Sequence, residues 1–289
     1  MIYILLLSTL FVNALPAIYS ESGLRRLLGY NNYTSDSHLL HHDNSLTDVE
    51  LFYRIAASLH PTSDKITVPD SIEGSHYYAE MYGSFMFPYI RKMHHFKKSI
   101  RFLEIGLGCD MKYGPGASVR IWQKIFSPTD EIWEAEYDKD CVDKARQGDQ
   151  LEGIHTIIGD QGNKDVLASW VKEINGELDM VVDDGGHQMH QIMFTFHALW
   201  PLVKPGGFYF VEDLQVCRGT DYSGEKVNGV YLNVLDIFKG WVEYLVTNNQ
   251  RPEPGVQPIP KGIKWILCQH EACVIAKCDE GTSHSTYCT

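Results

Sequence analysis

From residue 100 onward the sequence alternates short apolar runs with amphipathic segments, and this alternation constrains the fold more than any other feature. Apolar runs typical of strands occupy 100–106, 131–138, 154–160, 178–185 and 206–214. Helical spacing follows at 117–126, 141–147, 164–174, 187–202 and 229–246. Strands that alternate with helices predict an α/β fold, a mostly parallel sheet with helices on both faces. Two further runs, 262–268 and 272–278, flank the turn QHEA and predict a terminal antiparallel hairpin.

The chain before residue 100 divides into three segments. Residues 1–20 carry an apolar run that is too short to span a bilayer and is followed by small residues, which predicts a signal peptide. No Lys or Arg precedes that run, so a buried helix or an uncleaved anchor is the alternative. Residues 21–46 are polar and predict a flexible linker, whereas 47–99 predict a helical extension of the main domain at 100–280. Residues 281–289 form a tail.

Seven cysteines suit an oxidising compartment, and the odd number leaves at least one thiol unpaired or bridged to another chain. Cys268 and Cys273 flank the turn of the predicted hairpin, where a cross-strand disulfide and two buried thiols are the alternatives. The sequon at Asn32 bears a glycan only if the chain is secreted. The histidines of 38–42 indicate either a metal site or, more simply, a solvated segment.

The net charge of −12 argues against a nucleic-acid partner, because binding phosphates needs a basic patch. The sequence predicts no stable membrane span and leaves a homo-oligomer open.

Acidic residues and glycines close the first three predicted strands. Glu104, Gly106 and Gly108 end the first strand, where glycines allow a sharp turn and a close approach to a ligand. Glu136 ends the second strand, and its two oxygens can accept both hydroxyls of a ribose. Asp160 closes the third strand, where an acid can contact an adenine edge. Each carboxylate alone is an ordinary solvated loop residue; all three at successive strand ends indicate a nucleoside-like ligand.

The fourth and fifth strands end in more carboxylates. Asp183 and Asp184 begin the segment DDGGH, and Glu212 and Asp213 close the fifth strand. Neighbouring parallel strands end side by side, so Asp184, Glu212 and Asp213 are expected to converge. Converging carboxylates repel one another unless a cation neutralises them, and all-oxygen ligands favour Mg²⁺.

His187 follows at the predicted start of a helix and is a candidate general base, because a histidine side chain can take a proton from a hydroxyl near neutral pH. The competing interpretation is that His187 caps the helix and that the carboxylates bind only water.

Together, FLEIG, the E-x-D strand end, GDQ, DDGGH and VEDL resemble the metal-dependent sugar O-methyltransferases of macrolide biosynthesis and the related cephalosporin hydroxylase-like proteins. Segments at 63–65 and 76–82 resemble the family's pre-domain segment. The chain departs from the pattern at Gly186, where the family usually has serine, and in an insertion, CDMKYGPG, after the glycine turn. The resemblance implies a class I fold, a Rossmann-like sheet of seven strands.

The resemblance also assigns site residues and a reaction. It implies that S-adenosylmethionine (SAM) binds at Glu104, Gly106, Gly108, Glu136, Asp160 and Asp183, that Asp184, Glu212 and Asp213 bind Mg²⁺, and that His187 is the base. The expected reaction is methyl transfer to a hydroxyl of a sugar, polyol or glycosylated small molecule. The alternatives are a non-catalytic protein with a binding or scaffold role and a dinucleotide oxidoreductase, although the spacing G-x-G-x-x-G is absent.

Overall fold

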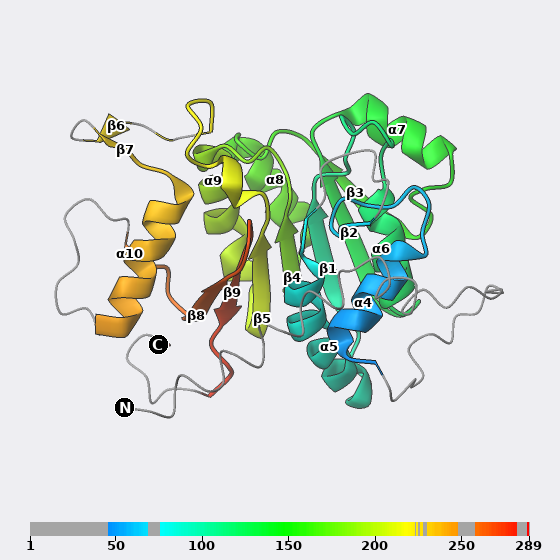
Figure 1. Cartoon of the computed structure of the whole chain (residues 1–289), viewed down its shortest axis with the longest axis horizontal. Helices are drawn as coiled ribbons and strands as arrows, with labels where there is room; N and C mark the ends of the chain where they lie inside the picture. Colours follow the sequence, from blue (N-terminus) through cyan, green and yellow to red (C-terminus); the bar gives the residue numbers. More distant parts are fainter. Residues whose placement is uncertain are drawn as a thin grey trace.

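The computed structural model describes residues 46–68, 76–222, 224, 226–227, 230–247, 258–281 and 288 (Figure 1). The predicted signal peptide, the sequon at Asn32, the histidines at 38–42 and almost all of the predicted linker lie outside these residues.

A seven-stranded sheet forms the centre of the molecule and confirms the predicted fold class. Its strands run in the order β3-β2-β1-β4-β5-β9-β8. They are β1 (Arg101–Ile105), β2 (Glu131–Glu136), β3 (Ile154–Ile158), β4 (Leu178–Asp183), β5 (Val203–Val211), β8 (Ile263–Cys268) and β9 (Cys273–Lys277). The first five pair in parallel, and β9 joins β5 antiparallel and pairs with β8 as the predicted hairpin.

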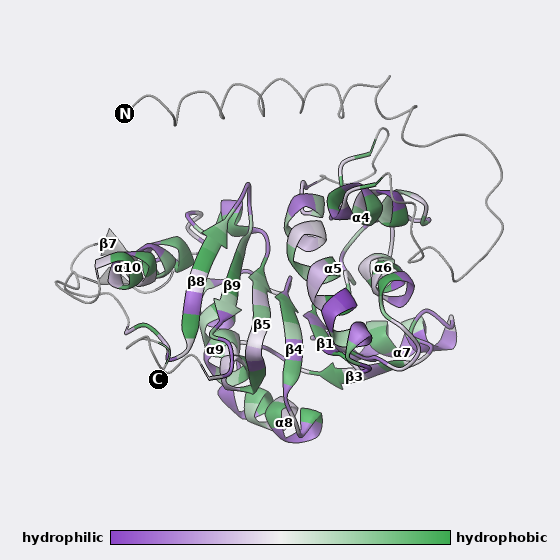
Figure 2. Cartoon of the chain, turned by 90° about the horizontal axis from the view of Figure 1, so that it is seen from below, coloured by the Kyte–Doolittle hydropathy of each residue, from purple (hydrophilic) through white to green (hydrophobic). Residues whose placement is uncertain are grey.

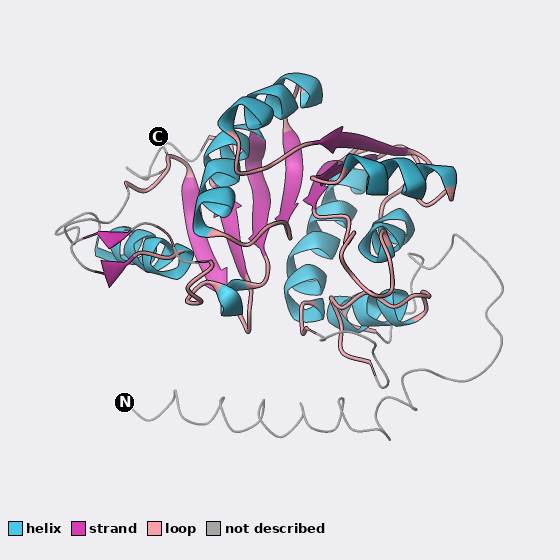
Figure 3. Cartoon of the chain, turned by 90° about the horizontal axis from the view of Figure 1, so that it is seen from above, coloured by secondary structure: helices cyan, strands magenta, loops and turns pink. Residues whose placement is uncertain are grey.

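Helices cover both faces of the sheet, as the views from below and above show (Figures 2 and 3). They are α4 (Asp48–Ala57), α5 (Ala79–His95), α6 (Ala117–Ile125), α7 (Lys139–Gln147), α8 (Lys164–Ile174), α9 (Met189–Leu199) and α10 (Val234–Thr247). Aromatic side chains of α8, α9 and α10 fill one core cluster, which includes Leu103 and Val181 of the sheet. Those of α4, α5 and α6 fill the other, which includes Phe102 and Val182. Odd and even positions of β1 therefore face opposite layers.

Local capping residues set several helix boundaries. Thr47 and Glu50 form a capping box at the start of α4. Asn163 caps α8, and Asn175 ends it in a left-handed conformation.

Three predicted elements have a boundary that differs from the structure by three residues or more. The predicted helix from 187 begins at Met189, after the cap residue Gln188, and its last turn is a separate 3₁₀ turn. The predicted strand 206–214 is β5, Val203–Val211. A small hairpin, β6 (Lys226–Val227) with β7 (Val230–Tyr231), precedes α10, which begins at Val234 and not at 229.

All seven cysteines lie among the described residues, and six form disulfides. The predicted Cys268–Cys273 bridge is present, joined by Cys109–Cys141 and Cys278–Cys288. Cys217 is a buried free thiol. No helix in the described ranges has the length and apolar character needed to cross a membrane.

Gly106 determines how closely the turns after β1 and β4 approach each other. Its φ is +108°, and a Cβ there would collide with the backbone carbonyl of Asp184. Gly114 also has a positive φ, +85°, but a Cβ there would meet open space. A comparison of the two positions therefore separates the destabilisation caused by a backbone collision from that caused by a positive φ.

We expect Gly106→Ala to lower the free energy of unfolding by about 2–4 kcal/mol, because it adds a backbone collision to the strained conformation. Gly114→Ala should cost only about 1 kcal/mol. Urea denaturation of both variants measures the difference. Equal losses would show that the turns after β1 and β4 can separate freely.

Candidate active site

A pocket of about 740 Å³ lies at the carboxyl edge of the parallel strands. The predicted residues Gly106, Gly108, Glu136 and Asp160 line it, together with Asp184, His187 and Asp213. Strand pairing explains this meeting, because β2, β1, β4 and β5 are consecutive in the sheet and end at the same edge. The pocket also extends over residues that the sequence analysis did not assign to the site: Ser63, Asp64, Tyr113, Gln191 and Tyr222.

Glu136 is held by backbone N–H groups. Its Oε2 accepts from the N–H of Leu107 at 3.0 Å, and its Oε1 accepts from that of Asp138 at 2.9 Å. Each oxygen keeps a second acceptor site, so the carboxylate can still receive two hydroxyls. Asp160 accepts from the N–H of Gly162 at 2.7 Å.

Two of the predicted cofactor residues do not line the pocket. Glu104 is fully buried on the α6 side of the sheet, where its Oε2 accepts from Ser118 Oγ and Trp122 Nε1, both at 2.7 Å. Asp183 is also buried and accepts from Gln161 Nε2 and Tyr209 OH, both at 3.0 Å. Burial raises the pKa of Asp183 to about 6, against the opposing effect of these hydrogen bonds. Direct contact of either residue with a cofactor stays a prediction.

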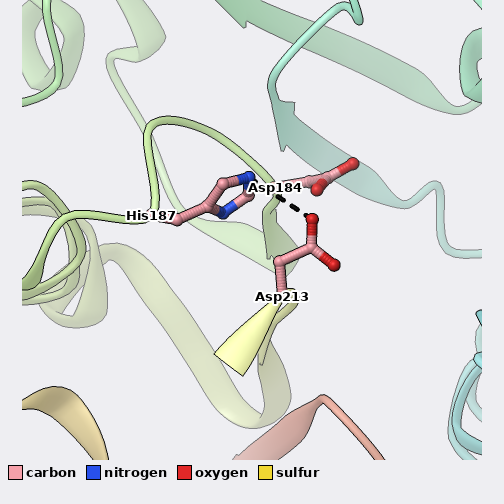
Figure 4. Close-up of side chains that lie close together, drawn as sticks. All are labelled: Asp184, His187 and Asp213. Carbon is pink, nitrogen blue, oxygen red and sulfur yellow. Dashed lines mark ion pairs between the residues drawn. The ribbon is translucent and has the colours of Figure 1, made fainter. Parts of the chain in front are cut away.

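Asp184, His187 and Asp213, which also line the pocket, form a cluster of side chains (Figure 4). One ligand atom from each lies within 4.8 Å of the others, and His187 Nε2 is 3.4 Å from Asp213 Oδ2. Burial alone would raise the pKa of Asp213, but His187 and the hydrogen bond from Tyr78 lower it below its usual value. Asp213 is therefore a charged carboxylate beside the imidazole.

Backbone geometry presents these side chains to the pocket. His187 and Asp213 have φ values of +56° and +55°. His187 therefore lies at a sharp turn before α9, and Asp213 at a sharp turn after β5. Gln161 holds the DDGGH turn by accepting from the N–H of Gly186 at 2.8 Å. A Cβ at Gly186 would meet the side chain of Gln191, which forms the capping box of α9 with Gln188. Glycine at 186, where the family usually has serine, thus leaves room for that box.

Lys65 is the main site residue whose role the sequence did not reveal. Its Nζ lies 2.8 Å from Glu212 Oε2, 2.9 Å from Asp184 Oδ2 and 3.2 Å from Glu104 Oε1, and the side chain is 1% exposed. Burial alone would lower the pKa of Lys65, but these carboxylates raise it well above the usual value. Lys65 is therefore a buried cation that joins the ends of β1, β4 and β5.

Glu212 faces Lys65 and does not belong to the Asp184–His187–Asp213 cluster. Both of its oxygens accept from Lys65 Nζ, and Oε1 also accepts from Tyr82 OH. Its assignment as a metal ligand stays a prediction. Asp213, in contrast, accepts from Tyr78 OH at 2.7 Å and lies 3.4 Å from His76 Nε2.

A second buried acid lies behind this network. Glu134 pairs in register with Glu104 across β1 and β2, and neither of its oxygens has a hydrogen-bond donor. Burial, and then the charge of Glu104, raise the pKa of Glu134 well above its usual value. Glu134 is accordingly a neutral acid, which limits the negative charge beneath the pocket.

The Asp184–His187–Asp213 cluster fits a hard divalent cation. Its two carboxylates, both partly exposed to the pocket, supply oxygen ligands, and the imidazole lies beside them; no thiolate takes part. Among the residues that the structure describes, no other group of three such side chains converges in this way.

Two signals in the sequence pointed to the segment that carries Lys65, although not to its role. Residues 63–65 and 76–82 matched the family pattern upstream of the domain. The structure brings Lys65, His76, Tyr78 and Tyr82 from this segment against the ends of β4 and β5.

We expect Lys65→Met to lower the free energy of unfolding by about 3–5 kcal/mol, because it leaves buried carboxylates without their cation. Urea denaturation in EDTA measures this loss. Adding Glu212→Gln should recover part of it, since the amide still accepts from Tyr82 and carries no charge. If Lys65→Met costs less than about 1 kcal/mol, the ammonium is not what holds these strand ends together.

Comparison with known proteins agrees with this geometry. Residues 108–214 match the family model of a methyltransferase domain. The chain is 32% identical over 164 residues to demethylmacrocin O-methyltransferase of Streptomyces fradiae, covering 56% of this chain and 39% of that one. It is 33% identical over 188 residues to mycinamicin VI 2''-O-methyltransferase of Micromonospora griseorubida, covering 62% and 44%. The chain thus spans less than half the length of these two relatives.

Among solved structures, the chain resembles the MycE methyltransferase of the mycinamycin pathway in complex with Mg and SAH. The TM-score is 0.56 at 25% identity, over 73% of this chain and 52% of that one. A further MycE complex, which also contains mycinamycin VI, gives a TM-score of 0.59 at 22% identity over 92% of this chain and 64% of that one, a likeness of fold. Residues 108–214 therefore match a methyltransferase domain, and the described chain shares its fold with the MycE methyltransferase.

Proposed function

We propose that this protein is a SAM-dependent, metal-assisted O-methyltransferase that acts on a hydroxyl of a sugar, polyol or glycosylated small molecule. One observation carries the proposal. A single pocket is lined both by the glycine turn, Glu136 and Asp160 and by Asp184, His187 and Asp213. A methyl donor and a hydroxyl acceptor can therefore meet within one cavity.

The glycine turn, Glu136 and Asp160 suit the nucleoside of SAM. Glu136, fixed by two backbone N–H groups, has acceptor sites for the two ribose hydroxyls. Asp160 lies at the end of the neighbouring strand β3, where an adenine edge would lie beyond the ribose. The MycE structure, which contains SAH, supports SAM as the cofactor of this chain.

Asp184, His187 and Asp213 suit the acceptor. Asp184 and Asp213 would hold Mg²⁺, the ion present in the MycE complex. When bound, this ion lowers the pKa of an acceptor hydroxyl and orients it. His187, 22% exposed and part of the pocket lining, is placed to take the hydroxyl proton at Nε2. Asp213 is charged beside that nitrogen and stabilises the imidazolium.

The chemical step is a displacement at the methyl carbon. A lone pair on the acceptor oxygen forms the O–CH₃ bond as the S–CH₃ bond breaks. The electron pair of the broken S–CH₃ bond stays on the sulfur, which gives SAH. The hydroxyl proton passes to His187. The remaining task of the protein is to align the two reactants, which the shared pocket performs.

We also propose that the protein works in the secretory pathway, with its N-terminal segment as the signal. The apolar run within residues 1–20 and the three disulfides support this location. The acceptor would then be a glycan or polyol in that compartment, with SAM supplied on the same side of the membrane.

His187→Asn tests the role of the base, because asparagine tolerates the positive φ at this position. We expect turnover to fall by roughly 10²–10⁴-fold with unchanged SAH affinity. His190→Asn, an exposed histidine three residues away that does not line the pocket, should retain full turnover.

The assay combines methyl-labelled SAM and Mg²⁺ with a panel of glycans and polyols, and it also decides between an enzyme and a scaffold. We expect transfer in the presence of Mg²⁺, and none in excess EDTA although SAH still binds. Full-rate transfer in EDTA would remove the metal from the mechanism. SAH binding without transfer to any acceptor would favour the non-catalytic alternative.

The secretory proposal predicts a mature N-terminus between Leu15 and Glu21 and a glycan on Asn32. Mass spectrometry of the native protein measures both features. A protein that retains Met1 and carries no glycan on Asn32 would contradict the proposed location but would leave the proposed reaction untouched.

A further inference from the structure

The inserted segment CDMKYGPG, residues 109–116, forms part of the pocket wall. Cys109, Asp110, Met111 and Tyr113 all line the pocket. They follow Gly108, so this loop lies beside the glycine turn on which the cofactor is proposed to rest. A loop with four pocket-lining residues in eight can influence how the ligand is held.

The loop has little backbone support of its own between Gly108 and Gly114. The two backbone hydrogen bonds described there, Met111 N–H to Gly108 O and Gly114 N–H to Met111 O, are internal to the loop. They shape two turns but do not attach the loop to the domain. Its attachment at Gly116, whose N–H donates to Leu107 O at 2.8 Å, lies at its base.

Side chains attach the loop at two places. On one side, Cys109 is bridged to Cys141 with a Cα–Cα distance of 6.1 Å. Cys141 lies in the first turn of α7, where its N–H donates to the cap residue Asp138. Asp138 in turn donates its N–H to Glu136, the proposed ribose-binding residue. The disulfide therefore ties the loop to the segment that fixes Glu136.

On the other side, Tyr113 donates a hydrogen bond to the carboxylate of Asp64. Burial, and then the charge of Asp64, raise the pKa of Tyr113, so its hydroxyl keeps the proton that it donates. Asp64 adjoins Lys65, which is anchored among the buried carboxylates. The loop thus runs between α7 and the N-terminal extension, attached to both.

We propose that residues 109–116 are a strap that the Cys109–Cys141 disulfide fastens over the cofactor pocket, and that opening this disulfide weakens SAM and SAH binding mainly by accelerating their release. This inference rests on the proposed function for the position of the cofactor. A strap that the disulfide fastens is already ordered before the ligand binds. The loop therefore loses less conformational entropy on binding. Once the bridge is opened, the loop loses its covalent attachment to α7.

The other disulfides offer a matched control. Cys268–Cys273 joins β8 to β9 at the turn of the terminal hairpin, and neither cysteine lines the pocket. Removing it changes the number of disulfides without touching the strap.

The experiment measures SAH dissociation by stopped-flow fluorescence and SAH affinity by calorimetry, using the oxidised full chain. We expect the variant Cys109→Ser/Cys141→Ser to release SAH about tenfold faster and to bind it about tenfold more weakly. Cys268→Ser/Cys273→Ser should match the wild type. TCEP converts each disulfide to two thiols, so reduction of the wild type should reproduce the faster SAH release of Cys109→Ser/Cys141→Ser. TCEP should not accelerate SAH release from that variant any further.

Tyr113→Phe keeps the test decisive if the double serine variant does not fold. It removes the second attachment while leaving the disulfide intact, and we expect it to accelerate SAH release several-fold. Circular dichroism of the TCEP-treated wild type confirms that the reduced protein is folded when its SAH release is measured.

Two results would overturn the inference in distinguishable ways. Equal SAH release from the oxidised protein, the folded reduced protein and Tyr113→Phe would contradict the strap while leaving the proposed function intact. An oxidised wild type that binds no SAH at all would contradict the proposed function, and the strap with it.

Discussion

The contact on which the carboxyl edge of the sheet depends is the burial of one ammonium, Lys65 Nζ, among three carboxylates. It lies within 3.2 Å of Glu104, Asp184 and Glu212, which come from the ends of β1, β4 and β5. Unpaired carboxylates at this density would be neutralised or pushed apart. One cation delivered from the N-terminal extension allows three strands to end in acids at the same place.

This contact also divides the acids by role. Glu104 and Glu212 face inward, where Ser118, Trp122 and Tyr82 complete their hydrogen bonds. Asp184 contacts Lys65 through one oxygen and remains partly exposed to the pocket. Asp213, turned by its left-handed backbone, faces His187 instead. The acids that can meet a metal and substrate are thus separated from those that support the edge.

The features that were predictable from the sequence are those encoded locally. The periodicity of apolar residues predicted the strands and helices of the sheet. Because parallel strands end at one edge, the motifs at the strand ends predicted residues that line one pocket: Gly106, Glu136, Asp160, Asp184, His187 and Asp213. Side-chain alternation puts Glu104 on the same face as the buried Phe102, and could have indicated that this acid does not line the pocket.

Long-range partners were not predictable in the same way. Lys65 meets Asp184 and Glu212 across 119 and 147 residues, and nothing near Lys65 in the sequence specifies that contact. The spacing of the cysteines likewise gives no indication that Cys109 pairs with Cys141. The Cys268–Cys273 bridge was predictable, because a short turn brings the two cysteines together. The left-handed turn at Asp213 depends on Tyr78, which is 135 residues away and hydrogen-bonds both its N–H and its carboxylate.

In the proposed metal site, Asp184 and Asp213 bind the ion while Lys65 holds the acids behind them. Anomalous scattering from a crystal grown with SAH and Mn²⁺ tests this division. We expect one anomalous peak bonded to Asp184 and Asp213, beside His187, with the Lys65 ammonium still on Glu212. No peak in the pocket, or a peak at the position of the Lys65 ammonium with that side chain displaced, would contradict it.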